Sequence, residues 1–155
     1  QPLCGACPFQ KKCIAFKNNL IKVLPVKEKK IKQKTRFFNY LVVTQGNKIF
    51  VHKRTSKDIW QHLFEFILVE TPALFSEEKF LKSPDFTSIF EGRTYTVTKV
   101  SNIVSQKLTH QTITGRFFHI KIKNSKTALK KYNLIPVSEL KKLAFPKFIA
   151  SYLQD

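Results

Sequence analysis

The sequence predicts an α/β or α+β fold, in which short helices flank a β-sheet. Runs rich in β-branched and aromatic residues occupy most of residues 37–123, and several of them alternate with polar residues. Segments with helix-start signals lie at residues 76–83 and 137–153. Strands combined with flanking helices are typical of these two mixed classes.

The first two strands are predicted at Phe37–Thr44 and Lys48–Arg54, joined by a short turn that contains Gly-Asn. Such a dipeptide between two β-rich runs indicates a hairpin. A third strand is predicted over Trp60–Glu70, and Pro72 would end it. A serine followed by two glutamates predicts a short helix over Ser76–Ser83.

Three further strands are predicted in the second half of the chain, at residues 94–97, 99–109 and 114–123. In the last of them, the alternation places Phe118, Ile120 and Ile122 on one face. Two helices then follow, at residues 137–143 and 145–153.

The amino-acid composition limits the class of partner. The 155 residues suit one compact domain with a tail, and a hydrophobic fraction of 43% provides enough apolar area for a core. Lysine and arginine number 28 against 10 acids, a formal net charge of +18. This charge attracts polyanions, so we expect nucleic acid; lysine that only solubilises the protein is the alternative. Apolar runs are too short to span a membrane, and we expect a soluble cytoplasmic protein of a bacterium, with no membrane partner.

Three cysteines near the start of the chain have the spacing of metal ligands. Cys4, Cys7 and Cys13 form C-x2-C-x5-C, which in a chain without a secretion signal indicates zinc or an iron–sulfur cluster. Both groups usually take four protein ligands. Because the nearest histidine, His52, lies in a predicted strand, we expect the fourth ligand upstream of residue 1. We therefore interpret the chain as a fragment from which the cluster is lost.

A basic segment separates the cysteines from the predicted sheet. We divide the chain into a cysteine segment, a connector and a sheet domain, at residues 1–16, 17–36 and 37–155. Pro25 opposes a continuous helix in the connector, which ends in a lysine-rich run. Lys27, Lys29 and Lys30 are predicted phosphate contacts; a hydrated charge run without a partner is the alternative.

The cysteine segment resembles part of a known cluster loop. The stretch Pro2–Ala15 is similar to the last three ligands of the C-x6-C-x2-C-x5-C loop in the endonuclease III superfamily, which holds a four-iron four-sulfur cluster. A long C-terminal region follows the loop here, as it does in the MutY family of adenine glycosylases. The segments Leu24–Val43 and Glu139–Leu153 are similar to that family's interdomain connector and C-terminal tail.

This resemblance implies a fold and a function. The C-terminal domain of the MutY family is similar to the Nudix hydrolases, which form an α/β/α sandwich with a mixed β-sheet. In the family, this domain recognises 8-oxoguanine paired with adenine in double-stranded DNA, and the groups that remove adenine belong to an N-terminal helical domain. The resemblance therefore implies a recognition module of a base excision repair enzyme. Its partners would be DNA and the N-terminal catalytic domain, and it would hold no catalytic residues.

The resemblance also implies a lesion-binding loop. The family's Phe-Ser-His loop between two strands corresponds to Leu108, Thr109 and His110, and Lys107 precedes them. The N7 of 8-oxoguanine carries a hydrogen that guanine lacks, so an acceptor such as a hydroxyl favours the lesion. Thr109 keeps the hydroxyl, whereas Leu108 replaces the family's aromatic ring. Without the resemblance, Leu108 is interpreted as an ordinary strand end and His110 as a surface histidine.

A second stretch, Lys53–Phe66, resembles the family's R-x5-W-x2-L-x-E-F-P segment. Ile67 replaces its Pro and His62 replaces a common Gly, which leaves the geometry of the turn open. Arg54 and Lys57 are predicted phosphate contacts. Trp60 is expected in the core, because a large apolar ring stabilises the fold most when it is buried.

Two other functions stay open at this stage. Nudix hydrolases need the pattern G-x5-E-x7-R-E-x2-E-E, whose glutamates bind magnesium, and this chain lacks it. Hydrolysis of oxidised nucleotides is nevertheless one alternative. The other is a protein-interaction module, in which the basic connector binds an acidic partner such as a sliding clamp or a mismatch-repair factor.

Overall fold

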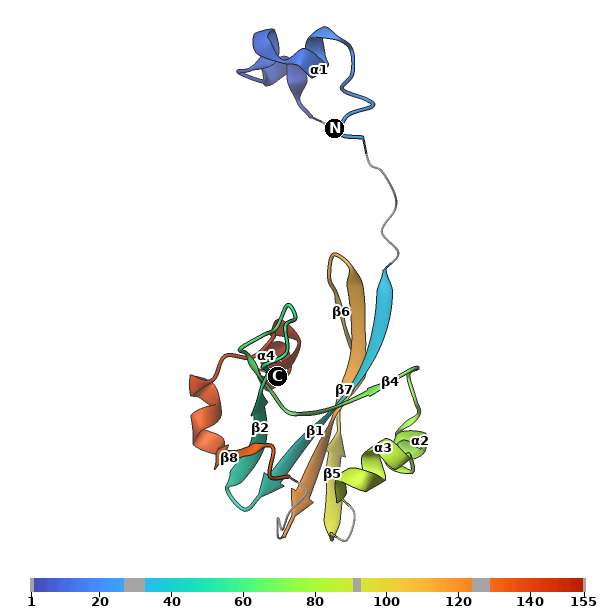
Figure 1. The fold of residues 1–155 in the computed structure, drawn as a ribbon, viewed down its shortest axis with the longest axis vertical. Coiled ribbons are helices and arrows are strands. Elements are labelled where there is room, and N and C mark those ends of the chain that lie inside the picture. Colours follow the sequence, from blue (N-terminus) through green and yellow to red (C-terminus); the bar gives the residue numbers. More distant parts are fainter. Residues whose placement is uncertain (1, 27–32, 91–92, 124–128, 155) are drawn as a thin grey trace. The chain divides into compact units, whose positions relative to one another are not determined.

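The computed structural model describes residues 2–26, 33–90, 93–123 and 129–154 (Figure 1). The chain divides into two compact units, residues 1–32 and 33–155. The predicted phosphate contacts Lys27, Lys29 and Lys30 lie outside the described residues.

The first unit consists of short helical turns. It contains the 3-10 turns η1 (Cys4–Ala6) and η2 (Gln10–Lys12) and the single α-helical turn α1 (Ile14–Lys17). None of the described residues 2–26 is buried. Local backbone hydrogen bonds, such as the one from Gln10 N to Cys7 O (3.0 Å), hold these turns. Their conformation therefore depends on neighbouring backbone groups and not on a hydrophobic core.

The second unit is built on β1 (Lys34–Gln45), a long strand inside the sheet. It pairs antiparallel with β2 (Lys48–Lys53) across a turn in which Gly46 has a φ of 57°. Glycine adopts this left-handed conformation without a steric penalty. The predicted hairpin is confirmed, although β1 begins at Lys34 rather than at Phe37.

The sheet is mixed, as the resemblance implies. Strand β7 (Gln111–Ile122) runs parallel to β1, with Lys34 opposite Gln111 and Thr44 opposite Lys121. Strands β5 (Tyr95–Val100) and β6 (Val104–Lys107) both pair antiparallel with β7. Parallel and antiparallel pairs therefore meet on one strand.

The strand predicted at residues 99–109 is interrupted. Strand β5 ends at Val100, and β6 begins at Val104 on the same edge of β7. Between them, Ser101 N donates to Phe117 O, and Ser101 Oγ accepts from Phe117 N, both at 2.9 Å. The serine side chain takes a hydrogen bond that a strand backbone would otherwise accept, so the ladder is broken there.

The strand predicted over Trp60–Glu70 is also divided. Only β3 (Phe64–Glu65), which pairs with β2, and β4 (Ile67–Thr71), which pairs with β1, are extended. Strand β8 (Asn133–Pro136), which no sequence signal predicts, pairs with β2. A four-residue strand is too short for periodicity to reveal.

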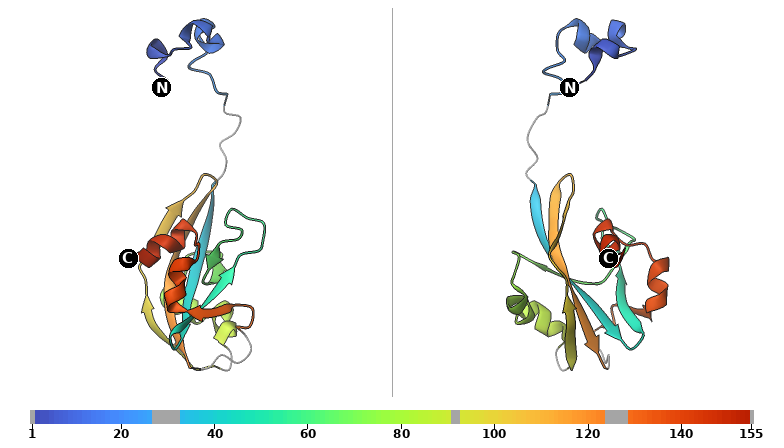
Figure 2. Two further views of the ribbon diagram at one scale, coloured as in Figure 1. Left: turned by 90° about the vertical axis from the view of Figure 1, so that its left-hand side faces the viewer. Right: turned by 180° about the vertical axis from the view of Figure 1, so that it is seen from behind.

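Short helices cover both faces of this sheet (Figures 1 and 2). Helix α2 (Glu77–Leu81) confirms the predicted helix, and Ser76 Oγ caps it by accepting from Lys79 N at 3.3 Å. Helix α3 (Pro84–Thr87) and the turn η3 (Ser88–Phe90) follow without having been predicted. Ser83 caps α3 and Pro84 occupies its first turn, which is a helix-start signal, but both elements are too short for a periodic pattern.

The two C-terminal helices were predicted with partial success. The segment η4 (Val137–Lys142) is a 3-10 helix and begins after Pro136 rather than at a serine cap. Helix α4 (Lys147–Gln154) confirms the last predicted helix and starts just after Pro146. Within the described parts of the chain, no helix has the length and apolar character needed to cross a membrane.

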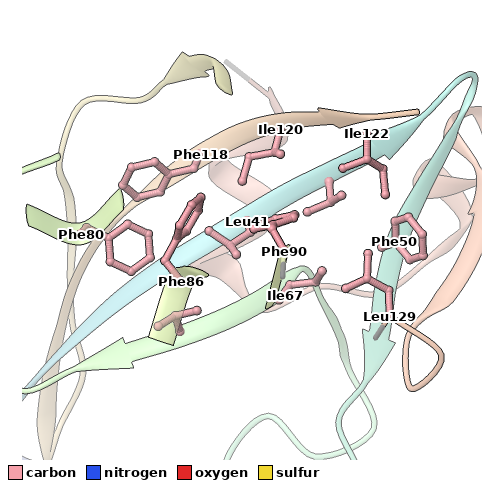
Figure 3. Close-up of a cluster of buried hydrophobic side chains, with 12 residues drawn as sticks. Leu41, Phe50, Ile67, Phe80, Phe86, Phe90, Phe118, Ile120, Ile122 and Leu129 are labelled. Carbon is pink, nitrogen blue, oxygen red and sulfur yellow. The ribbon is translucent and has the colours of Figure 1, made fainter. Parts of the chain in front are cut away.

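The hydrophobic core lies in two layers, one on each face of the sheet. The first core cluster joins residues of the sheet to α2, α3 and η3, and Figure 3 shows Phe80 and Phe86 beside Phe118. Its buried members are Leu41, Val43, Phe50, Ile67, Val69, Phe80, Phe86, Phe90, Phe118, Ile120, Ile122 and Leu129. The predicted common face of Phe118, Ile120 and Ile122 is confirmed.

The second core cluster lies under α4. Its buried members are Phe38, Tyr40, Val42, Ile49, Val51, Trp60, Phe66, Ile113, Phe117, Phe148 and Ile149. Tyr152 of α4 stacks on Phe117 with ring centres 3.7 Å apart and hydrogen bonds to His119 Nε2. Burial, assisted by Lys99, lowers the pKa of His119. Helices on both faces make the predicted α/β/α sandwich.

Candidate nucleic-acid interface

The hairpin between β6 and β7 carries the predicted lesion-binding residues Leu108, Thr109 and His110 at its tip. Leu108 N donates to Gln111 O at 2.8 Å and closes the turn. Lys34 N, at the start of β1, donates to His110 O at 3.2 Å. One bond therefore closes the turn itself, and the other ties the tip to β1.

The tip residues differ in their surroundings. Leu108 is half-buried and packs against the second core cluster, which is the strand-end role that its sequence alone indicates. Thr109, His110 and the preceding Lys107 are exposed. The hydroxyl and the imidazole are therefore accessible to a ligand, while the leucine anchors the turn.

A second segment, residues 54–63, lies beside this tip. Its residue Ile59 and the tip residues Lys107–Gln111 line one pocket of about 410 Å³, which we call the tip pocket. Lys57, a predicted phosphate contact, is exposed in the same segment. The fold thus gathers two regions that are distant in the sequence into one concave surface with cations nearby.

Arg54, another predicted phosphate contact, has an internal position. Its guanidinium forms ion pairs with Asp58 and Glu65, and only 10% of its side chain is exposed. It also lies over the Trp60 ring, 5.6 Å from the ring centre. Two carboxylates already compensate the charge of Arg54, and its side chain is largely buried. Arg54 therefore stabilises the 54–63 segment and does not contact a phosphate.

Burial and pairing act against each other in this ion-pair group. Burial raises the pKa of Glu65, although the charge of Arg54 opposes the shift. Burial would also raise the pKa of Asp58, but hydrogen bonds from Arg54 and from the backbone of Trp60 outweigh it and lower that pKa. Burial would lower the pKa of Arg54, and the two carboxylates together raise it instead.

Trp60 is buried, as predicted, with 8% of its surface exposed. Its ring packs edge-on against Phe38, with ring centres 6.1 Å apart. Ile59 and Lys34 are neighbours of the candidate loop that the sequence does not predict. In the sequence, Ile59 is only an aliphatic residue within a polar stretch, and Lys34 is one lysine among many. Neither feature indicates that the fold places the residue beside the loop.

The three cysteines do not make a complete cluster site. Cys4 and Cys13 are half-buried, Cys7 is exposed, and all three are free thiols. In the described parts of the chain, no three His, Cys, Asp or Glu side chains gather where they could hold a metal ion. Three thiolates also leave one iron of a four-iron cluster without a cysteine. The residues present therefore do not fit that cluster.

The glutamates of the β3 to α2 region are dispersed. Glu65 pairs with Arg54, Glu70 accepts two hydrogen bonds from Arg36 (2.6 and 2.8 Å), and Glu78 pairs with Lys82 at 2.5 Å. A hydrogen bond from Arg36 lowers the pKa of Glu70. These carboxylates balance nearby cations individually, and they do not converge on one point as magnesium ligands do.

Known proteins resemble the chain in sequence. A model of the NUDIX domain matches residues 39–155. The chain is 43% identical over 68 residues to the adenine DNA glycosylase of Buchnera aphidicola subsp. Schizaphis graminum, a match that covers 42% of this chain and 19% of the relative. It is 28% identical over 116 residues to the adenine DNA glycosylase of Buchnera aphidicola subsp. Baizongia pistaciae, covering 72% of this chain and 30% of the relative. The matches span less than a third of these curated relatives, and they confirm the predicted resemblance.

Solved structures share the architecture. The MutT protein from Methanosarcina mazei Go1 superposes with a TM-score of 0.60 at 9% identity, covering 81% of this chain and 94% of that one. The C-terminal domain of mouse MUTYH, solved with human PCNA, superposes with a TM-score of 0.56 at 13% identity, covering 77% and 85%. At such identities the likeness concerns the fold alone. Since the domain model matches most of the chain and the mixed sheet lies between helices, the chain belongs to the NUDIX domain family.

Proposed function

We propose that this chain is the lesion-recognition region of an adenine DNA glycosylase and binds double-stranded DNA that carries 8-oxoguanine opposite adenine. The observation that carries the proposal is the tip pocket, in which exposed Thr109 and His110 stand beside Lys107. The names of the Buchnera relatives support the enzyme class. The net charge of +18 supports a polyanionic partner.

The chemistry of the lesion suits this pocket. The N7–H of 8-oxoguanine needs an acceptor, which the Thr109 hydroxyl can supply, whereas guanine presents an acceptor at N7. Because a hydroxyl can also donate, the discrimination requires that Thr109 gives its own hydrogen to another group, such as a phosphate or a backbone carbonyl. Lys57 and Lys107 contact the flanking phosphates and fix the position of the duplex. The excision of adenine itself belongs to a separate catalytic domain, which is the second partner. The four-iron four-sulfur cluster stays a prediction for a longer chain that supplies the fourth ligand.

The test is a double substitution, Thr109→Ala with His110→Ala, in a full-length glycosylase that contains this chain. We expect the preference for 8-oxoguanine:adenine over guanine:adenine to fall by about tenfold, because one discriminating hydrogen bond is worth about 1–2 kcal/mol. Single-turnover cleavage and duplex binding measure that preference.

A matched control is Thr94→Ala, which removes an exposed hydroxyl just before β5. It should leave the preference unchanged. A double variant that keeps the full preference for the oxidised base would refute the assignment of the tip.

The alternative functions are less well supported. Among the described residues, the glutamates are dispersed and do not form the group of magnesium ligands that a Nudix hydrolase needs. Magnesium-dependent turnover of oxidised dGTP by this chain would overturn the recognition role. We also propose a sliding clamp as a further partner, because the C-terminal domain of mouse MUTYH was solved in complex with human PCNA.

A further inference from the structure

The 54–63 segment is held in place at many points. Asp58 Oδ1 accepts from Trp60 N at 2.8 Å, and Gln61 Nε2 donates to Thr55 O at 3.2 Å. His62 N donates to Arg54 O at 2.8 Å and closes the segment. Together with the ion pairs of Arg54, these bonds give the segment one preferred conformation.

Ile59 is the exception within this ordered segment. The residue is 66% exposed, although its neighbours Asp58 and Trp60 are anchored by an ion pair and by the core. Because both neighbours are fixed, Ile59 could point inward only if the Asp58 ion pair or the packing of Trp60 were broken. An exposed aliphatic side chain is common on protein surfaces by itself. Here, however, it lines the same pocket as Thr109 and His110.

The surroundings of Ile59 match a nucleic acid. Lys57 is exposed two residues before it, and Lys107 lines the same pocket. Duplex DNA presents phosphates around apolar base and sugar surfaces, and groove-binding proteins often place aliphatic side chains against those surfaces. Cations that flank one exposed isoleucine reproduce the complementary arrangement.

We propose that Ile59 is the apolar contact of the DNA interface and packs against a base or sugar near the lesion. This inference rests on the proposed function and extends it to a residue that the hairpin tip does not contain. Thr109 and His110 read the oxidised base, the two lysines hold phosphates, and Ile59 removes water from the surface between them.

The experiment compares Ile59→Ala, Lys57→Ala and the unchanged chain in binding to an 8-oxoguanine:adenine duplex over a salt series, followed by fluorescence anisotropy. Ile59→Ala should weaken binding by about three- to tenfold, the loss expected for part of one buried side chain. Its salt slope should stay unchanged, because an apolar contact releases no counterion. Lys57→Ala should instead lower the slope by about one unit.

The matched control is Ile103→Ala, because Ile103 is 50% exposed and lies before β6, at the end of that strand away from the tip. It should bind as the unchanged chain does, and thermal unfolding should show that all variants are folded. Failure of the unchanged chain to bind DNA would overturn the proposed function. An unchanged chain that binds, with Ile59→Ala equal to it or altered in salt slope, would overturn only the role of Ile59.

Discussion

His62 occupies a backbone position that suits glycine. Its φ is 71°, in the left-handed region that costs a residue with a Cβ about 1–2 kcal/mol. The sequence resemblance already marks this position as one where Gly is common. Histidine in place of glycine therefore costs energy at this turn but leaves its backbone conformation unchanged, since His62 N still donates to Arg54 O.

His62→Gly should raise the free energy of unfolding by roughly 0.5–1 kcal/mol. This is the left-handed penalty less the extra entropy of glycine in the unfolded chain. Chemical denaturation of both proteins measures the change. His62→Ala is the control, because it removes the imidazole and keeps the Cβ. A glycine variant no more stable than the alanine variant would contradict this account.

At the scale of elements, the parallel pair β1 and β7 depends on one glycine. Gly115 lies opposite Phe38, and a Cβ at Gly115 would stand 1.9 Å from Phe38 O. The obstacle is backbone in the middle of the sheet, so a side chain rotation cannot relieve it. Both strands also carry the two core clusters on their faces.

Gly115→Ala should therefore destabilise the second unit by about 3 kcal/mol, the upper range for overpacking. Thr114→Ala is the control at the adjacent position, where the hydroxyl makes only an exposed bond to Ser105 (3.0 Å). It should cost less than about 1 kcal/mol. If Gly115→Ala and Thr114→Ala had equal unfolding midpoints, β7 could not approach β1 as closely at Gly115 as the structure shows.

At the scale of the whole molecule, burial is concentrated in one unit. All buried members of the two core clusters lie between residues 38 and 149, whereas the described residues 2–26 include none that is buried. The hydrophobic contribution to stability therefore belongs to the second unit.

A chain of residues 33–155 should unfold in a single transition, with a midpoint within about 2 °C of the 155-residue chain. Calorimetry of both chains measures this. Retained cooperativity with a much lower midpoint would mean that the first unit stabilises the second.

The sequence predicted the parts of the fold that have local causes. Alternation identified the faces of β7, the Gly-Asn turn identified the β1–β2 hairpin, and Ser76 identified the start of α2. Prediction from the sequence failed for elements too short to show a periodic pattern, such as β8 and α3. It also failed at Ser101, where a side-chain hydroxyl accepts a hydrogen bond from backbone N–H and interrupts the strand. The candidate tip was found through the resemblance, because exposed Thr and His residues have no distinctive local pattern.

The sequence by itself determined the sheet domain and its positive charge, because composition, periodicity and short motifs are local properties, and its resemblance to a known family indicated the candidate loop Leu108–His110. Only the tertiary structure decided that Arg54 is used inside the protein, that Lys34 ties the loop to β1, and that Ile59 shares its pocket. Those facts depend on which distant segments the sheet brings together, and strand pairing is fixed by the burial of both core clusters at once.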